Sequence, residues 1–391
     1  MRIALVYDGV YPYSVGGGEK LFHDLARYLG QRHDVSVLGL KMWDGPEVIE
    51  VAPRVRIHGI CVPDAAGTLQ AGDARGVRQA LRFARSACSA LRQLGPFDVV
   101  DCMSIPYFPL YAAHLQCRAS GAALVSTWLE CWGRDHWREY LGSEIKARVA
   151  SAVERYAMRL PRHIVSISPQ TSEALSRAGV DAARLTTITP WLDWPAIQSA
   201  QPGRESYDVL FVGRLIKSKG ADLLIEAVAF AAAHRPGLRC RIVGDGPERP
   251  RLEALVVQLG LSETVTFSGF LDCHDDVIAV MKAARLLVLP SRREGFGIVV
   301  IEAAAAGAVP ITIDTPNNAA RNLVRESGCG AVCADSPEEL AEAIQHFLDL
   351  PEGRYAAEQD RGRAWARQYD FPRAAEAYEA VYTRVAGEAR G

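Results

Sequence analysis

Strand-like apolar runs alternate with longer amphipathic stretches along the first half of the chain. Val77–Leu94 and Ser143–Arg159 place apolar residues at helical spacing, which predicts helices. Short apolar runs that are bounded by polar residues or glycine predict buried strands. They lie at Ile3–Tyr7, Asp34–Leu40, Val99–Cys102, Ala123–Thr127 and His163–Ser168. Strands and helices that alternate in this way are typical of a parallel sheet covered by helices, the α/β class.

The same alternation restarts in the second half of the chain. Strand-like runs lie at Asp208–Val212, Arg239–Val243, Val265–Phe267, Leu286–Leu289 and Val309–Ile313. The irregular stretches 189–195 and 201–204 predict a linker between the halves. We therefore expect an N-terminal α/β domain of residues 1–195, joined by a closing helix within 372–391, and a second α/β domain of residues 196–371. Two such domains of similar size predict a ligand between them.

Composition narrows the classes of partner. The 391 residues are 49% hydrophobic, enough for two cores, and the formal net charge of −2 argues against a nucleic-acid partner. The N-terminus enters a strand without a signal-peptide pattern, and charges interrupt every apolar run before it reaches membrane-spanning length. Nine cysteines without a Cys-x-x-Cys pair predict reduced thiols, so we expect a cytoplasmic protein.

Arginines recur at near-helical spacing before and within the predicted helix Val77–Leu94. They lie at Arg75, Arg78, Arg82, Arg85 and Arg92. The slightly negative net charge favours a solvated face, and peripheral contact with an anionic membrane is the alternative.

Three glycines, Gly16, Gly17 and Gly18, stand between the first predicted strand and a helix predicted over Glu19–Leu29. Backbone N–H groups at a helix N-terminus lack partners and carry partial positive charge, so they favour an anion such as phosphate. The alternative is a turn that only lets the chain reverse.

A cationic turn follows the first strand of the second half. Arg214 and Lys219 lie between the strand Asp208–Val212 and a helix predicted over Asp222–Ala233. Ligands of open α/β sheets bind at the carboxyl ends of strands. Arginine grips phosphate in a bidentate fork and lysine adds a mobile charge, so the turn predicts a phosphate site. An ordinary cationic loop is the alternative.

Two carboxylates flank a second glycine turn. Glu294 precedes Gly-Phe-Gly, and Glu302 lies about two turns into the following helix, beside the apolar run Ile298–Ile301. Carboxylates at these places favour hydroxyl donors, a ribose for Glu302 and a sugar for Glu294. A solvent-facing helix residue is the alternative for Glu302.

Together these motifs resemble the retaining glycosyltransferases of family 4. The resemblance rests on Glu-x7-Glu at 294–302, Gly-Arg-Leu-x3-Lys-Gly at 213–220 and Val-Gly-Asp-Gly-Pro at 243–247. It implies the GT-B fold, two Rossmann-like domains with parallel sheets facing a central cleft. It also implies transfer of a sugar from a UDP- or GDP-sugar to a small-molecule or lipid-like acceptor, with no cofactor. The chain contains no Asp-x-Asp, the usual motif of metal-dependent glycosyltransferases, so we expect no metal.

The resemblance also implies roles for single residues. Arg214 and Lys219 would hold the donor diphosphate, and Glu294 would bind the transferred sugar. Glu302 would bind the ribose, and the segment from Gly269 to Leu271 would meet the base. Backbone amides facing phosphate and sugar would come from Phe296, Gly297, Ile298 and Val299. The glycines at 16–18 would face the same diphosphate from the other domain.

The chain departs from the family pattern at Leu129, where members usually carry a histidine near the donor sugar. Leucine offers only apolar bulk there, so we expect a deoxygenated or extended sugar, such as an octose of antibiotic biosynthesis. Trp128 and Tyr11 belong to a group of aromatics that would line an acceptor pocket, with core packing as the alternative.

Two other functions remain open at this stage. A non-catalytic nucleotide-sugar-binding partner subunit is one, and intact Glu294 and Glu302 argue against it. A sugar-nucleotide epimerase of similar fold is the other, and it would leave no glycosylated product.

Overall fold

The computed structural model describes residues 1–14, 16–64, 76–271 and 273–390, so Arg75 lies outside the described residues. The chain forms two compact units. Unit 1 comprises Met1–Pro190 and Pro372–Gly391, and unit 2 comprises Trp191–Phe371.

Unit 1 is built on an eight-stranded sheet in the order β3-β4-β2-β1-β5-β6-β7-β8. Every neighbouring pair is parallel except the hairpin of β3 and β4. The strands are β1 (Arg2–Val6), β2 (Asp34–Leu40), β3 (Val48–Ala52), β4 (Val55–Cys61), β5 (Val99–Met103), β6 (Ala123–Trp128), β7 (His163–Ser166) and β8 (Leu185–Thr187). Its helices are α1 (Gly17–Leu29), α2 (Val77–Leu94), α3 (Tyr107–Ser120), α4 (Gly133–Leu141), α5 (Glu144–Ala157), α6 (Pro169–Arg177) and α15 (Phe371–Arg390).

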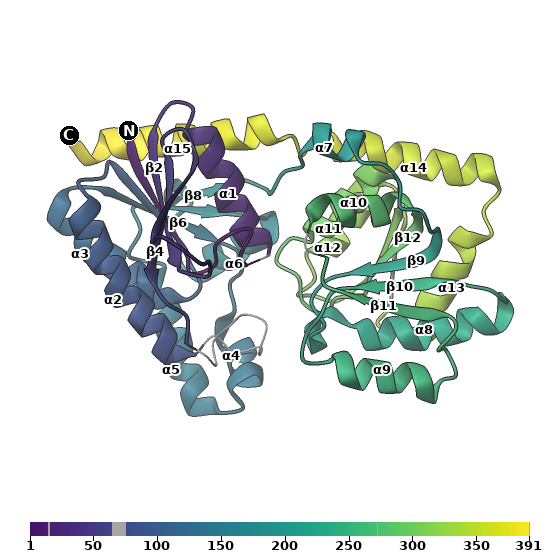
Figure 1. Cartoon of the computed structure of the whole chain (residues 1–391). Helices are drawn as coiled ribbons and strands as arrows, with labels where there is room; N and C mark the ends of the chain where they lie inside the picture. Colours follow the sequence, from purple (N-terminus) through teal and green to yellow (C-terminus); the bar gives the residue numbers. More distant parts are fainter. Residues whose placement is uncertain (15, 65–75, 272, 391) are drawn as a thin grey trace. The chain divides into compact units, whose positions relative to one another are not determined.

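Unit 2 is built on a six-stranded, fully parallel sheet in the order β11-β10-β9-β12-β13-β14. The strands are β9 (Tyr207–Val212), β10 (Cys240–Val243), β11 (Val265–Gly269), β12 (Ala284–Leu289), β13 (Val309–Ile313) and β14 (Ala331–Cys333). Its helices are α7 (Trp194–Ser199), α8 (Ala221–His234), α9 (Arg249–Gln258), α10 (His274–Lys282), α11 (Ile298–Ala306), α12 (Ala320–Ser327), α13 (Pro337–Leu348) and α14 (Glu352–Ala366). Helix α8 packs with α9 and α13, whereas α11 packs with α10, α12 and α14 (Figure 1). The expected α/β class with two parallel-sheet domains is confirmed.

The C-terminal helix α15 completes unit 1 and is the yellow helix that ends at the label C in Figure 1. The Tyr382 hydroxyl donates to Asp101 Oδ2 on β5 at 2.6 Å, and both residues are fully buried. On the same helix, one carboxylate oxygen of Glu379 lies 2.7 Å from the guanidinium of Arg32, and the other lies 2.8 Å from Nε2 of His33. Unit 1 is therefore assembled from both ends of the chain.

Candidate functional site

The candidate site of unit 2 lies on the turns that follow β9 and β12. These strands are parallel neighbours in the sheet, so their carboxyl ends lie at the same edge. The two turns contact each other through their backbones, because the amide of Arg292 donates to the carbonyl of Ser218 at 2.8 Å. Segments about 75 residues apart in sequence are thus brought side by side.

Lys219 and Glu294 form the central contact at this edge. Lys219 Nζ donates to Glu294 Oε2 at 2.5 Å, and the Ser291 hydroxyl lies 3.5 Å from the same oxygen. The side chains are only 22% and 14% exposed, which limits screening by water. Arg214 is exposed on the same β9 turn and has no ion pair within the described part of the chain. The edge therefore presents a cation without a carboxylate partner beside one that has a partner.

The backbone of Glu294 is fixed by the connection between β13 and α12. Its amide donates to the Asn317 carbonyl and its carbonyl accepts from the Ala319 amide, both at 2.9 Å. Asn318 is fully buried and anchors that connection, since its amide nitrogen donates to the carbonyl of Ile313 at 2.9 Å. The backbone of Glu294 is therefore held in place from two sides, by strand β12 before it and by the connection that follows β13.

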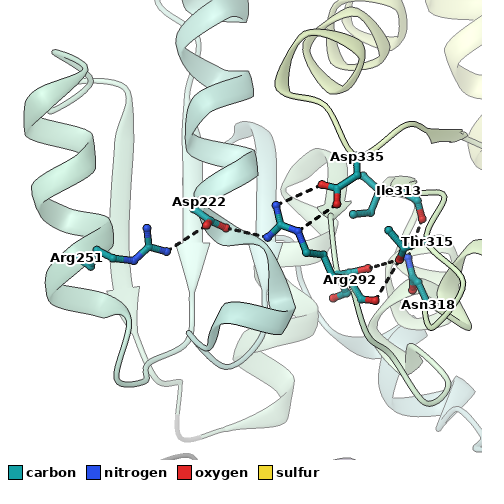
Figure 2. Close-up of polar contacts among 8 residues, drawn as sticks. Asp222, Arg251, Arg292, Ile313, Thr315, Asn318 and Asp335 are labelled. Carbon is teal, nitrogen blue, oxygen red and sulfur yellow. Dashed lines mark hydrogen bonds and ion pairs between the residues drawn. The ribbon is translucent and has the colours of Figure 1, made fainter. Parts of the chain in front are cut away.

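Arg292 braces the same turn from the outside, as Figure 2 shows. Its guanidinium lies 3.1 Å from Asp335 and 3.6 Å from Asp222, and Asp222 also accepts from Arg251 at 3.1 Å. Its carbonyl accepts from the Thr315 hydroxyl at 3.1 Å. These exposed pairs link the β12 turn to α8, α9 and the segment after β14. Each pair is weak by itself, but together they restrict the turn.

Helix α11 begins directly after the turn, at the residues predicted to offer backbone amides. Gly297 is its N-cap with φ +95°, a conformation that favours glycine. Ile298 and Val299 lie in the first helical turn, where N–H groups have no acceptor within the helix. The Phe296 ring is buried and packs against Tyr369 with centroids 5.9 Å apart, so only its backbone is suited to a ligand.

Glu302 is buried in α11, with 5% of its surface exposed. The Nε2 atom of His274, the first residue of α10, lies 3.4 Å from Glu302 Oε1. Sequence reasoning missed His274, because this residue belongs to no motif and its contact with Glu302 depends on how α10 packs on α11. Leu271 is half-buried three residues before it, on the connection that leaves β11.

The Val-Gly-Asp-Gly-Pro motif packs on the β9 turn. The amide of Leu215 donates to the Asp245 carbonyl at 2.9 Å, and the amide of Glu248 donates back to the Leu215 carbonyl at 3.0 Å. This motif therefore supports the turn that carries Arg214.

In unit 1 the glycine turn lies at the start of α1. Gly16 is the N-cap and Gly17 and Gly18 belong to the first helical turn, two residues earlier than the predicted helix. A Cβ on Gly18 would lie 3.2 Å from Leu129 Cδ1 and 3.3 Å from the Tyr7 hydroxyl. Close packing thus accounts for Gly18, whereas a Cβ on Gly17 would meet nothing within 4 Å. Gly17 is the glycine of this turn that remains exposed.

The three residues predicted at the acceptor or sugar end have different surroundings. The structure corrects the expectation for Trp128, whose indole is fully buried in the core of unit 1 and offers no surface to a substrate. Tyr11 is half-buried, with its ring 4.9 Å from that of His23. Leu129 is half-buried beside Gly18, and its carbonyl accepts from the Thr171 hydroxyl at 3.3 Å.

Beyond Leu129, the buried carboxylate of Glu154 organises the start of α4. It accepts from the amides of Trp132 and Gly133 at 2.7 and 2.9 Å. It also accepts from the Tyr107 hydroxyl at 2.8 Å and from the Trp137 indole at 3.1 Å. This buried acid fixes the aromatic segment that follows Leu129.

Three further observations concern the described residues alone. No group of three or more histidine, cysteine, aspartate or glutamate side chains among them is placed to hold a metal ion. None of their helices has the length and apolar character needed to cross a membrane.

On α2, the four described arginines of the basic series are exposed, and Arg82 pairs with Asp64.

Two α/β units with parallel sheets, and a strand edge in unit 2 that carries cations, helix-start amides and a carboxylate, fit the class of glycosyltransferases. Comparison with known families supports this class. Residues 16–191 match the family described as "Glycosyl transferase 4-like domain", and residues 195–363 match "Glycosyl transferases group 1". The chain belongs to the family 4-type glycosyltransferases of the GT-B fold.

Individual proteins of known function or structure are also similar to this chain. The 2-deoxystreptamine glucosyltransferase of Streptomyces kanamyceticus is 29% identical over 339 residues, 81% of this chain and 85% of the relative. Sucrose-phosphate synthase of Thermosynechococcus elongatus has a similar structure, with a TM-score of 0.79, 22% identity and 98% of both chains covered. HepE of Anabaena, solved with UDP and glucose, aligns with a TM-score of 0.74 and 20% identity over 98% of this chain and 100% of its own.

Proposed function

We propose that this glycosyltransferase moves a sugar from a UDP- or GDP-sugar to a small-molecule or lipid-like acceptor, with retention of anomeric configuration and without a metal. The observation that carries the proposal is the contact of Lys219 with Glu294, next to the exposed Arg214. A phosphate-binding cation and a hydroxyl-accepting carboxylate then share one strand edge with the first-turn amides of α11.

In the proposed mechanism, the bond between the anomeric carbon and the phosphate oxygen breaks and leaves negative charge on the nucleoside diphosphate. Arg214, Lys219 and the amides of Ile298 and Val299 stabilise that charge as it develops. The acceptor oxygen bonds to the anomeric carbon, and its proton moves to a phosphate oxygen of the leaving group. No side chain of the enzyme is required as a nucleophile.

The lysine has enough donors for this role while it keeps its partner. An ammonium group carries three N–H donors, so Lys219 can bind phosphate and still donate to Glu294. Glu294 then retains its second oxygen for hydroxyls of the transferred sugar.

The sugar and the acceptor are proposed from one residue of unit 1 and from the names of two similar proteins. The family resemblance expects a histidine near the outer end of a hexose at the position of Leu129, so the leucine favours a sugar that is deoxygenated or extended there. The relative named a 2-deoxystreptamine glucosyltransferase makes 2-deoxystreptamine the first acceptor to test, within antibiotic biosynthesis. The HepE structure with UDP makes UDP-sugars the first donors.

The test is an incubation of the purified chain with a panel of UDP- and GDP-sugars and 2-deoxystreptamine. We expect release of nucleoside diphosphate together with a glycoside detected by mass spectrometry. The anomeric configuration of the glycoside, read by NMR, should equal that of the donor. An isomerised nucleotide sugar without any glycoside would instead support the epimerase, and binding without turnover would support the partner subunit.

A further inference from the structure

The carboxylate of Glu302 has an ionisable partner on a separate helix. Burial of a carboxylate is costly unless it is hydrogen-bonded or paired, and only 5% of Glu302 is exposed. The His274 ring meets it with Nε2 at 3.4 Å from Oε1 and is itself 26% exposed. The pair is therefore shielded from water on the carboxylate side and accessible on the imidazole side.

His274 stands at the end of the connection that leaves β11. That connection begins at Gly269, whose carbonyl accepts from the Gly244 amide at 2.7 Å, and α10 starts at His274 and packs on α11. The segment from Gly269 to Leu271 is the one expected to meet the nucleotide base. The same connection therefore carries both the segment expected to meet the base and His274, the partner of Glu302.

We propose that His274 is a positioning residue that orients the Glu302 carboxylate toward the ribose hydroxyls of the donor. This inference rests on the proposed function. With its proton on Nε2, the imidazole donates toward Oε1 and restricts rotation of the carboxylate, so that the acid is preorganised before the nucleotide arrives. Without the imidazole, the acid has more freedom and the ribose hydroxyls lose a fixed acceptor. Phosphate binding, which depends on other residues, changes little.

The readout is discrimination between a ribonucleotide and its 2′-deoxy analogue. We would measure by calorimetry the Kd of UDP, GDP and both 2′-deoxy analogues for the wild type, His274→Ala and His274→Gln. A loss of ribose recognition weakens the binding of the ribonucleotide alone, whereas general damage to unit 2 weakens the binding of both the ribonucleotide and its 2′-deoxy analogue. The matched control is His234→Ala, because this exposed histidine is the last residue of α8 and its Nδ1 lies 3.0 Å from the Phe230 carbonyl of the same helix.

We expect the wild type to prefer the ribonucleotide by about tenfold, the size expected for one hydrogen bond to a charged group. His274→Ala should reduce this preference to less than about threefold. His274→Gln should keep most of it, since its side-chain amide can still donate, and His234→Ala should keep all of it.

Three results overturn the inference. They are a wild-type preference retained in His274→Ala, an equal loss of both nucleotides in that variant, and a wild type that binds both nucleotides equally well. A wild type that binds neither UDP nor GDP overturns the proposed donor as well, so failure of the inference and failure of the proposed function are distinguishable.

Discussion

The contact between Lys219 and Glu294 joins two side chains that the family resemblance assigns to different parts of the donor. Lysine is expected at the diphosphate and glutamate at the sugar, yet their atoms lie 2.5 Å apart. This geometry is reasonable for a donor whose phosphate is bonded directly to the sugar. It also means that removal of either side chain leaves the other in a partly buried place without its partner.

Lys219→Ala should therefore lower turnover far more than it lowers stability. We expect a loss of kcat of about a hundredfold or more, the range for removal of one group that stabilises transition-state charge. Initial rates with a saturating donor and the thermal midpoint would be measured together. Lys217→Ala is the control, because this neighbouring lysine is exposed on the same turn. Turnover of Lys219→Ala within twofold of wild type would show that the phosphate site has been misplaced.

Leu129→His tests the specificity proposed for the donor sugar. A hydroxyl that meets leucine in place of an imidazole lacks a hydrogen-bond partner, a difference of about 1–3 kcal/mol, or roughly fivefold to 150-fold in rate. We expect the variant to gain turnover with unmodified hexose donors and to lose it with deoxygenated or extended ones. kcat/KM for each donor, with both bases, is the measurement. Efficient wild-type transfer from an unmodified hexose that the histidine reduces would contradict the proposal.

At the scale of elements, Glu154 shows how one buried side chain holds a helix. Four donors converge on its carboxylate, from Tyr107, Trp132, Gly133 and Trp137. No residue of α4 is buried, although the half-buried Trp137 of this helix packs against the core of unit 1. The position of α4 therefore depends on this acid of α5 together with the packing of Trp137.

Glu154→Ala should destabilise unit 1 by about 3 kcal/mol or more, because several buried donors lose their acceptor at once. Glu154→Gln keeps one acceptor oxygen and should lose less. Urea unfolding gives both values, and the exposed Glu139→Ala on α4 is the control, expected within about 0.5 kcal/mol of wild type. Equal stability of Glu154→Ala and Glu139→Ala would show that the buried acid does not hold the helix.

The same element explains what sequence could and could not predict. The central strands of both sheets were predictable, because they are short apolar runs whose side chains are buried on both faces of the sheet. Examples are Ile3–Tyr7 and Leu286–Leu289. Helix α4 and strand β3 lack that signal, since their residues are mostly exposed. Strand β4 is more buried, but Arg56 and His58 interrupt its apolar run. The contacts of Glu154 with the start of α4 could not be predicted, because they join residues that are distant in the sequence.

The candidate site divides in a similar way. The turn after a strand predicted that Arg214 and Lys219 would lie at a ligand-binding edge, and the structure places Glu294 beside them on the turn of the neighbouring strand. The contact of Glu302 with His274 could not be predicted, because it depends on the packing of two helices. For Trp128 the structure supports the alternative of core packing, which the sequence left open because tryptophan at the end of a strand has the same pattern whether its ring faces a ligand or the core.

For the whole molecule, the order of segments couples the two ends of the chain. Unit 2 is inserted between β8 and α15 of unit 1, so unit 1 is complete only when the last helix has been made. The contact of that helix with the sheet includes a buried acid, Asp101, which accepts from the Tyr382 hydroxyl and from the hydroxyl and amide of Thr127. Docking of α15 is thereby linked to the ionisation of one side chain.

Burial raises the pKa of Asp101 from 3.8 to about 6, against the opposing effect of its hydrogen bonds from Tyr382 and Thr127. The folded state then binds this proton more tightly than the unfolded state. The stabilisation is fully present below about pH 4 and is lost as the pH rises through about 6. Between these limits the change in the free energy of unfolding is about 3 kcal/mol.

Asp101→Asn cannot ionise, so it should remove this pH dependence. Relative to wild type, the variant should gain up to about 3 kcal/mol in stability between pH 4 and pH 7.5. Hydrogen exchange of the β5 amides across that range would report on unit 1 specifically, with Asp44→Asn, an exposed carboxylate of the same unit, as the control for net charge. A difference between Asp101→Asn and wild type that stays constant with pH would show that Asp101 is ionised throughout. The attachment of α15 to the sheet would then be independent of pH in this range.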